Sequence, residues 1–183
     1  MRVPRRVSHA QNAEDIRVWR AFRDRPQNGL FYVDVGANEP RHLSITASLG
    51  DMGWRGLLIE ADPVLAADLR VHRPDDTVVE VAAASGPGEL VFHRVPGTGL
   101  GTLDAAEAEE ARRRGFEVAE VRVRTESLDA ILVNHGVSDI HFMTIDVEGA
   151  EAVVLQGLSL TEFRPWVLCI EAVYPGTSTP SHD

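Results

Sequence analysis

Hydrophobic residues follow two alternating patterns along the chain. In residues 12–23, Ile16, Trp19 and Phe22 recur at a spacing of three, which predicts an amphipathic helix. Compact apolar runs without a helical period predict buried strands, and a segment that alternates valine with charge predicts a half-exposed strand. These strands are expected at residues 30–35, 56–60, 77–81, 90–95, 117–124, 140–145 and 166–172.

Helical patterns fill the intervals between the expected strands. Asp62 and Pro63 suit the N-cap and the first position of a helix whose inward side chains are Leu65 and Leu69. Further helices are expected around residues 45–52, 104–114, 127–135 and 149–157. Strands that alternate with helices at this spacing predict an α/β fold with a doubly wound, mostly parallel sheet. We expect a tail and an N-terminal helix over residues 1–28, and one domain over residues 29–183.

The composition is that of a globular domain with excess negative charge. A formal charge of −10 and a pI near 5.1 oppose binding to a nucleic acid backbone. No apolar stretch is long enough to span a membrane and no secretory signal is present, so we expect a cytoplasmic protein without membrane contacts. Cys169, the single cysteine, lies in an apolar run and is expected to pack as a small apolar side chain. The glycine-rich residues 97–101 are expected to form a mobile loop.

Ligands of such sheets bind at the carboxyl ends of the strands. The first strand carries Asp34 near its end, and Gly36, Ala37 and Asn38 follow in a tight turn that brings backbone N–H groups close to a ligand. This turn lacks the G-x-G-x-x-G pattern that binds a pyrophosphate, which disfavours NAD and FAD. It therefore favours S-adenosylmethionine, a cofactor without phosphate groups. A purely structural glycine is the alternative.

The ends of the second and third strands add candidate cofactor contacts. Glu60 ends the second strand 24 residues after Gly36, where an acidic side chain is placed to accept hydrogen bonds from ribose hydroxyls. A surface role for Glu60 is the alternative, and Ala61 follows it in the same turn. Ala82 and Ala83 follow the third strand, where small side chains would leave room for an adenine ring. Core packing would also explain these two alanines.

Carboxylates gather after the strand at residues 140–145. Asp146 and Glu148 end this strand, and Glu151 begins the next helix. Their oxygen atoms would suit magnesium or calcium. The simpler interpretation needs no metal, because Glu148 and Glu151 complement a helix N-terminus and Asp146 contacts cofactor or substrate. His42, in the loop after the first strand, titrates in the range of a general base.

These motifs, in this order and spacing, resemble the FkbM family of methyltransferases. The similar segments are FYVDVGANEP at residues 31–40, SIT at 44–46, GWRG at 53–56, IEADP at 59–63, GTGLGTL at 97–103, IDVEGAE at 145–151 and RPW at 164–166. Upstream, QNAED at residues 11–15 resembles the S-Q-N-x-E-D motif of the family, although His9 and Ala10 depart from its beginning. Gly101 also stands where the family usually has serine.

The resemblance implies a Rossmann-like class I methyltransferase that moves a methyl group from S-adenosylmethionine to a hydroxyl. The acceptor would be a small molecule such as a sugar, a polyketide or another secondary metabolite. His42 and Asp146 are the catalytic candidates, and no metal is expected. The strand ends and the resemblance together predict these cofactor contacts: Gln11, Asp34, Gly36, Ala37, Asn38, Glu60, Ala61, Ala82, Ala83, Asp146 and Glu148.

The C-terminal region favours two further expectations. The family pattern continues beyond the strand at residues 166–172, whereas this sequence ends at Asp183, so we expect a sheet shortened at this end. The last strand is apolar on both faces and would form an edge that invites pairing, which predicts a homo-oligomer. A non-catalytic S-adenosylmethionine-binding or partner subunit is the alternative function. A nicotinamide oxidoreductase is disfavoured because the second glycine of its motif is missing.

Overall fold

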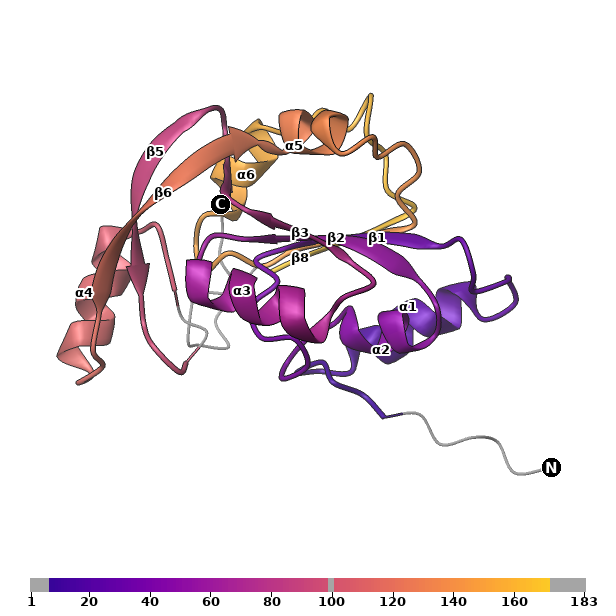
Figure 1. Cartoon of the computed structure of the whole chain (residues 1–183), viewed down its shortest axis with the longest axis horizontal. Coiled ribbons are helices and arrows are strands. Elements are labelled where there is room, and N and C mark those ends of the chain that lie inside the picture. Colours follow the sequence, from indigo (N-terminus) through magenta and orange to yellow (C-terminus); the bar gives the residue numbers. More distant parts are fainter. Residues whose placement is uncertain (1–6, 99–100, 172–183) are drawn as a thin grey trace.

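The computed structural model describes residues 7–98 and 101–171. Within them, five strands form a parallel sheet in the order β3-β2-β1-β7-β8, and three strands form a second sheet in the order β4-β6-β5 (Figure 1). The strands are β1 (Phe31–Val35), β2 (Arg55–Glu60), β3 (Thr77–Glu80), β4 (Ala82–Ala84), β5 (Gly88–Arg94), β6 (Ala119–Ser127), β7 (Phe142–Ile145) and β8 (Val167–Ile170). The helices are α1 (Glu14–Phe22), α2 (Ala47–Asp51), α3 (Pro63–His72), α4 (Ala105–Arg113), α5 (Leu128–Asn134) and α6 (Glu151–Gln156).

Helices cover both faces of the five-stranded sheet. α1, α2 and α3 lie along one face, and α5 and α6 lie along the other (Figure 1). Side chains alternate along β1, so Tyr32 packs with Trp54 in the core on the α1–α3 side, whereas Val33 packs with Ile131 of α5 on the opposite side. Burial on both faces explains why the strands read as continuous apolar runs. The prediction of a doubly wound, mostly parallel α/β sheet is confirmed.

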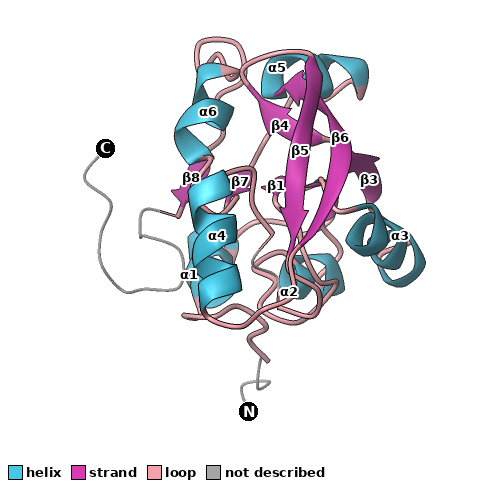
Figure 2. Cartoon of the chain, turned by 90° about the vertical axis from the view of Figure 1, so that its left-hand side faces the viewer, coloured by secondary structure: helices cyan, strands magenta, loops and turns pink. Residues whose placement is uncertain are grey.

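The second sheet differs from the sequence prediction. β3 ends at Glu80, and the alanines expected to follow it in a connection form a separate strand, β4, paired in parallel with β6. β5 pairs with β6 in antiparallel fashion, and the resulting ribbon stands beside one end of the main sheet together with α4 (Figure 2). This arrangement brings β4 and β5 to the carboxyl ends of the main strands. The second sheet therefore supplies a wall to any cavity there.

Helix α1 has nearly the predicted bounds but presents a different face to the core. Its buried residues are Asp15, Val18 and Phe22. The expected inward residues Ile16 and Trp19 are only half-buried. Asp15 turns inward because its carboxylate accepts a hydrogen bond from the hydroxyl of Ser48 on α2, a partner that periodicity within α1 cannot indicate.

The glycine-rich loop at residues 97–101 includes residues 99 and 100, which lie outside the described part, and its mobility is untested. The division into a tail and a domain at residue 28 also stays a prediction.

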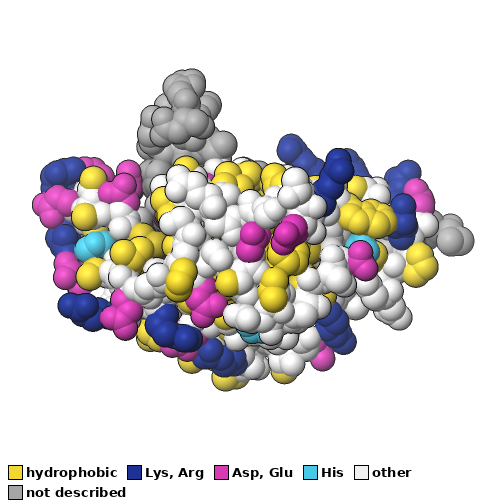
Figure 3. Space-filling model, turned by 90° about the horizontal axis from the view of Figure 1, so that it is seen from above, with side chains coloured by type: hydrophobic (Ala, Val, Ile, Leu, Met, Phe, Trp, Pro, Cys, Tyr) yellow, Lys and Arg dark blue, Asp and Glu magenta, His cyan; other side chains and the backbone are white. Residues whose placement is uncertain are grey.

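Along the stretches that the structure describes, no helix combines the length and apolarity needed to cross a membrane. The face seen in Figure 3 carries acidic and basic side chains interspersed with one another, so the excess negative charge does not form an acidic patch there.

Candidate functional site

A cavity of about 930 Å³ opens at the carboxyl ends of β1, β2 and β7. Every residue expected at the site lines this cavity. They are Gln11, Asp34, Gly36, Ala37, Asn38, His42, Glu60, Ala61, Ala82, Ala83, Asp146 and Glu148. The parallel register explains the convergence, because Val35 of β1 lies beside Ile59 of β2 and Ile145 of β7.

The turn after β1 is held tightly against both neighbouring strands. The backbone N–H groups of Gly36 and Ala37 both donate to the carbonyl oxygen of Ile59, at 2.9 and 3.2 Å. Gly36 has a φ of 81°, and a Cβ atom at this position would lie 1.8 Å from the carbonyl oxygen of Asp146. Glycine is therefore required for the ends of β1 and β7 to approach this closely.

Glu60 is a buried carboxyl group in the cavity wall. The residue is 5% exposed, and its two carboxyl oxygens accept hydrogen bonds from the backbone N–H groups of Asn38 and Asp62, each at 2.8 Å. Burial raises the pKa of Glu60 to about 7, although both hydrogen bonds favour the charged form. Each carboxylate oxygen has a second lone pair, so the group can still accept a hydrogen bond from a ligand.

Asp34 connects the cavity to a buried polar network that the sequence analysis missed. Its carboxylate accepts a hydrogen bond of 2.6 Å from the hydroxyl of Thr46, and burial raises its pKa to about 6. The guanidinium of Arg73 donates to Thr46, and to the hydroxyl of Tyr32 at 2.7 Å, and forms an ion pair with Asp76. Nothing in the local pattern around Arg73, at the end of α3, indicates that it points inward.

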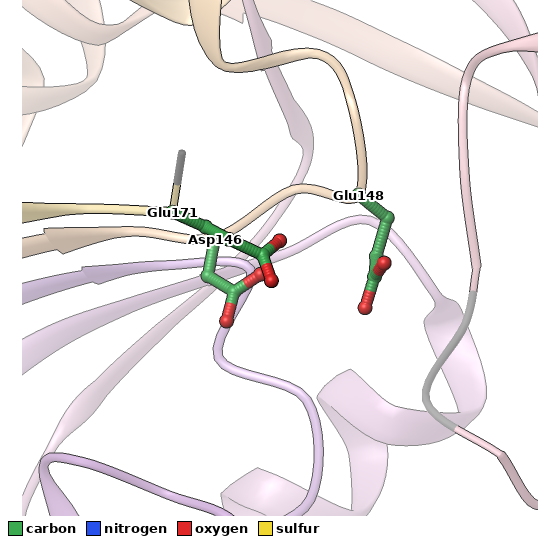
Figure 4. Close-up of side chains that lie close together, drawn as sticks. All are labelled: Asp146, Glu148 and Glu171. Atoms are coloured by element: carbon green, nitrogen blue, oxygen red, sulfur yellow. The ribbon is translucent and has the colours of Figure 1, made fainter. Parts of the chain in front are cut away.

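Three carboxyl groups face one another at the β7–β8 side of the cavity. Asp146, Glu148 and Glu171 each contribute an oxygen atom, and these atoms lie within 4.8 Å of one another (Figure 4). The sequence analysis missed Glu171, which directly follows β8. The available signal was its position at the carboxyl end of the last parallel strand, the same edge at which β7 delivers Asp146.

The electrostatics of this group are unfavourable in the absence of a ligand. Burial raises the pKa values of Asp146 and Glu171, whose side chains are hydrogen bonded to each other. Burial, followed by the negative charges of Asp146 and Glu151, raises the pKa of Glu148 to about 7. Glu148 also has a φ of 52°, in the left-handed region that disfavours residues with a Cβ. The hydroxyl of Thr102 donates to its carbonyl oxygen at 2.9 Å and holds this conformation.

Glu151 and Glu148 have different roles at the start of α6. A Glu151 oxygen accepts from the backbone N–H groups of Val147 and Gly149 at 3.0 and 3.3 Å, so Glu151 holds the loop that leads into α6, and its predicted interaction with the helix dipole stays a prediction. Glu148 lines the cavity instead. Asp62 caps α3 as predicted, accepting from the N–H of Val64 at 2.8 Å.

The second sheet forms part of the cavity wall. Phe92 and Arg94 of β5 line it, and the guanidinium of Arg94 forms an ion pair of 2.5 Å with Asp62. This contact ties β5 to the turn that carries Glu60. The arrangement combines a tight strand-end turn, a buried acid on the neighbouring strand and a set of carboxyl groups, which suits a ligand with hydroxyl groups and positive charge.

Comparisons with known proteins assign the chain to a family. A sequence family described as the Methyltransferase FkbM domain matches residues 34–181. The crystal structure of Methyltransferase FkbM from Methylobacillus flagellatus KT is similar in fold, with a TM-score of 0.50 and 18% sequence identity. The likeness covers 91% of this chain, which spans 45% of the length of that one. The search of curated proteins finds no match. Because the matched domain extends over most of the sequence, as its motifs led us to expect, the chain belongs to the FkbM methyltransferase family.

Proposed function

We propose that this protein is an S-adenosylmethionine-dependent O-methyltransferase acting on a hydroxyl of a small molecule such as a sugar, a polyketide or another secondary metabolite. The observation that carries the proposal is the single cavity in which the Gly36 turn, Glu60 and Asp146 meet at the ends of adjacent strands. Membership of the FkbM family supports methyl transfer as the chemistry.

The residues of the cavity suit S-adenosylmethionine. Glu60 offers a carboxylate to ribose hydroxyls at the end of β2, and Ala82 and Ala83 add little bulk beside a flat adenine ring. When bound, S-adenosylmethionine supplies a methyl group on a positively charged sulfonium, which an acidic cavity favours. The remaining residues that we propose to contact it are Gln11, Asp34, Gly36, Ala37, Asn38, Ala61, Asp146 and Glu148.

In this reaction the protein would position the acceptor oxygen, exclude water and accept the proton of the hydroxyl group. We propose Asp146 for proton transfer, because its residue lines the cavity beside the Gly36 turn. His42 lines the same cavity from the loop after β1 and is the second candidate. We propose that this step needs no metal.

Calorimetric titration with S-adenosylmethionine tests the cofactor site. Replacing Glu60 by alanine removes charge-assisted hydrogen bonds of about 1.5–3 kcal/mol each, so affinity should fall at least about tenfold. Glu89→Ala is a matched control, because Glu89 is an exposed acid on β5 outside the cavity. Unchanged affinity in Glu60→Ala would remove Glu60 from the site.

Transfer of labelled methyl to hydroxyl compounds, with a chelator present, tests the chemistry. Methylated product under these conditions supports a metal-free O-methyltransferase. Activity that is lost with chelator and restored by magnesium would instead make Asp146 and Glu148 metal ligands. Tight cofactor binding without transfer to any hydroxyl acceptor would support the non-catalytic binding subunit.

A further inference from the structure

The charges that line the cavity are far from balanced. The acidic residues among them are Asp34, Glu39, Glu60, Asp62, Asp146, Glu148 and Glu171. The sequence contains no lysine, so arginine supplies every permanent positive side-chain charge. Of the described residues that line the cavity, Arg94 is the one arginine, and its ion pair with Asp62 neutralises it. A phosphate group on a ligand would meet repulsion here and find no free arginine among these residues.

The strand order divides this cavity between the two substrates of the proposed function, on which the present inference rests. β1 lies between β2 and β7. The adenosine of a cofactor held by Glu60 and the Gly36 turn would occupy the β1–β2 side, and its methionine end would reach toward the β7–β8 side, where the acceptor must meet the methyl group. That side carries Asp146, Glu148 and Glu171, and it is distinct from the position proposed for the ribose.

The described part of the chain provides no counter-charge for these three carboxyl groups. In the described parts of the chain, neither Glu148 nor Glu171 forms an ion pair with an arginine or histidine. One oxygen of Glu171 is fully buried and has no hydrogen-bond partner there. Like charges so close together oppose one another, and a cation delivered by the ligand would relieve this repulsion.

The spacing suits an ammonium group. A tetrahedral ammonium with N···O distances of about 2.8 Å can bridge acceptors up to about 4.6 Å apart, and one oxygen atom from each of the three groups lies within 4.8 Å of the other two. We propose that the acceptor is a hydroxyl compound with a protonated amine, such as an amino sugar or amino alcohol, held by Asp146, Glu148 and Glu171 at the β7–β8 side of the cavity.

Amine binding is coupled to proton release in this arrangement. Burial and neighbouring charge raise the pKa of Glu148 to about 7, and a bound ammonium would lower it again. Binding near neutral pH therefore releases protons to the buffer. The heat of amine binding measured by calorimetry should therefore differ between buffers of different ionisation enthalpy. This difference should be smaller in the Glu148→Gln variant.

A series of sugars that differ in charge tests the proposal. The probes are glucosamine, glucose and glucose 6-phosphate, measured by saturation-transfer NMR on protein saturated with S-adenosylhomocysteine. We expect glucosamine to bind at least about tenfold more tightly than glucose, with glucose 6-phosphate weakest. The double variant Glu148→Gln/Glu171→Gln should lose this preference. Glu117→Gln changes net charge at an exposed position outside the cavity and should keep it.

Each other outcome overturns the inference in a recognisable way. Equal or undetectable binding of all three sugars would contradict an amine-binding region. A preference that Glu117→Gln also abolishes would reflect only the net charge of the chain. If the double variant loses affinity for S-adenosylhomocysteine as strongly as for glucosamine, the carboxyl groups bind the amine of the cofactor instead. Failure of wild type to bind S-adenosylhomocysteine would refute the proposed function itself.

Discussion

A close contact between the backbones of Gly36 and Asp146 sets the geometry where β1 and β7 end. Gly36 lies so close to Asp146 that a Cβ would meet the Asp146 carbonyl oxygen at 1.8 Å. That oxygen belongs to the backbone, which cannot rotate away as a flexible side chain would. Any side chain at position 36 must therefore separate the ends of β1 and β7, and both ends carry proposed site residues.

We expect Gly36→Ala to lower the free energy of unfolding by about 3 kcal/mol, because it combines a strained φ with a steric clash. Gly136→Ala is the matched control, since Gly136 has a φ of 64° and open space around the position of a Cβ. The control should cost only about 1–2 kcal/mol. Urea denaturation of both variants measures the difference, and equal losses would contradict the clash.

At the scale of elements, the turn between β2 and α3 joins three parts of the fold. Asp62 caps α3 through the N–H of Val64, donates its own N–H to Glu60 and holds Arg94 of β5. The second sheet is thus linked to the main sheet at the residue proposed to bind ribose. Asp62, which the sequence predicts as a helix cap, therefore also links the two sheets through its ion pair with Arg94.

We expect Asp62→Ala to lower the free energy of unfolding by about 2–4 kcal/mol, because it removes a cap worth about 1 kcal/mol and leaves Arg94 without its partner. Asp104→Ala is the control: Asp104 caps α4 through the N–H of Ala106 at 2.7 Å and forms no ion pair among the described residues. Its loss should cost about 1 kcal/mol. Chemical denaturation compares the two, and similar costs would show that the Arg94 link is not stabilising.

Over the whole molecule, the acids of the cavity couple folding to pH. Burial raises the pKa of Glu60 from 4.5 to about 7 and the pKa of Asp34 from 3.8 to about 6. At a pH between the ordinary and the raised pKa of each group, the folded protein still holds a proton that the unfolded chain has released. The unfolding free energy therefore decreases as the pH rises through this range.

We expect the ligand-free protein to be more stable near pH 5.5 than near pH 8, since a carboxyl with a raised pKa is least costly while protonated. The Glu60→Gln variant should show a smaller difference, because glutamine does not ionise. Urea denaturation at the two pH values gives both quantities. A stability that rises with pH, or an unchanged slope in the variant, would contradict the assignment.

The outer edge of β8 motivates a proposal of self-association. No strand among the described residues pairs with this edge, and the adjoining Trp166 is 53% exposed. Exposed apolar edges favour pairing with a second chain, most simply about a two-fold axis. Light scattering after size-exclusion chromatography should give a mass above 20.1 kDa. A monomer at every concentration measured would refute the proposal.

Much of the site could be predicted because parallel strands converge. Asp34, Glu60 and Asp146 each lie at or near the carboxyl end of a strand that an apolar run identifies, so locating the strands places them at one edge. The roles of Arg73 and Glu171 could not be predicted, because their partners are distant in sequence. Arg73 contacts Tyr32, and Glu171 contacts Asp146. No local period encodes such pairings.

The sequence by itself determined the strands of the main sheet and the helices that cover it, because apolar runs and capping residues within each short segment indicate them. It also determined the family, through motifs that keep their order. Only the tertiary structure decided that Ala82–Ala84 pairs with β6 and that Asp15 of α1 faces inward toward Ser48. It likewise decided which carboxyl groups meet around the cavity. The reason is physical: these features arise from contacts between segments far apart along the chain, whose energies appear only when the chain has folded.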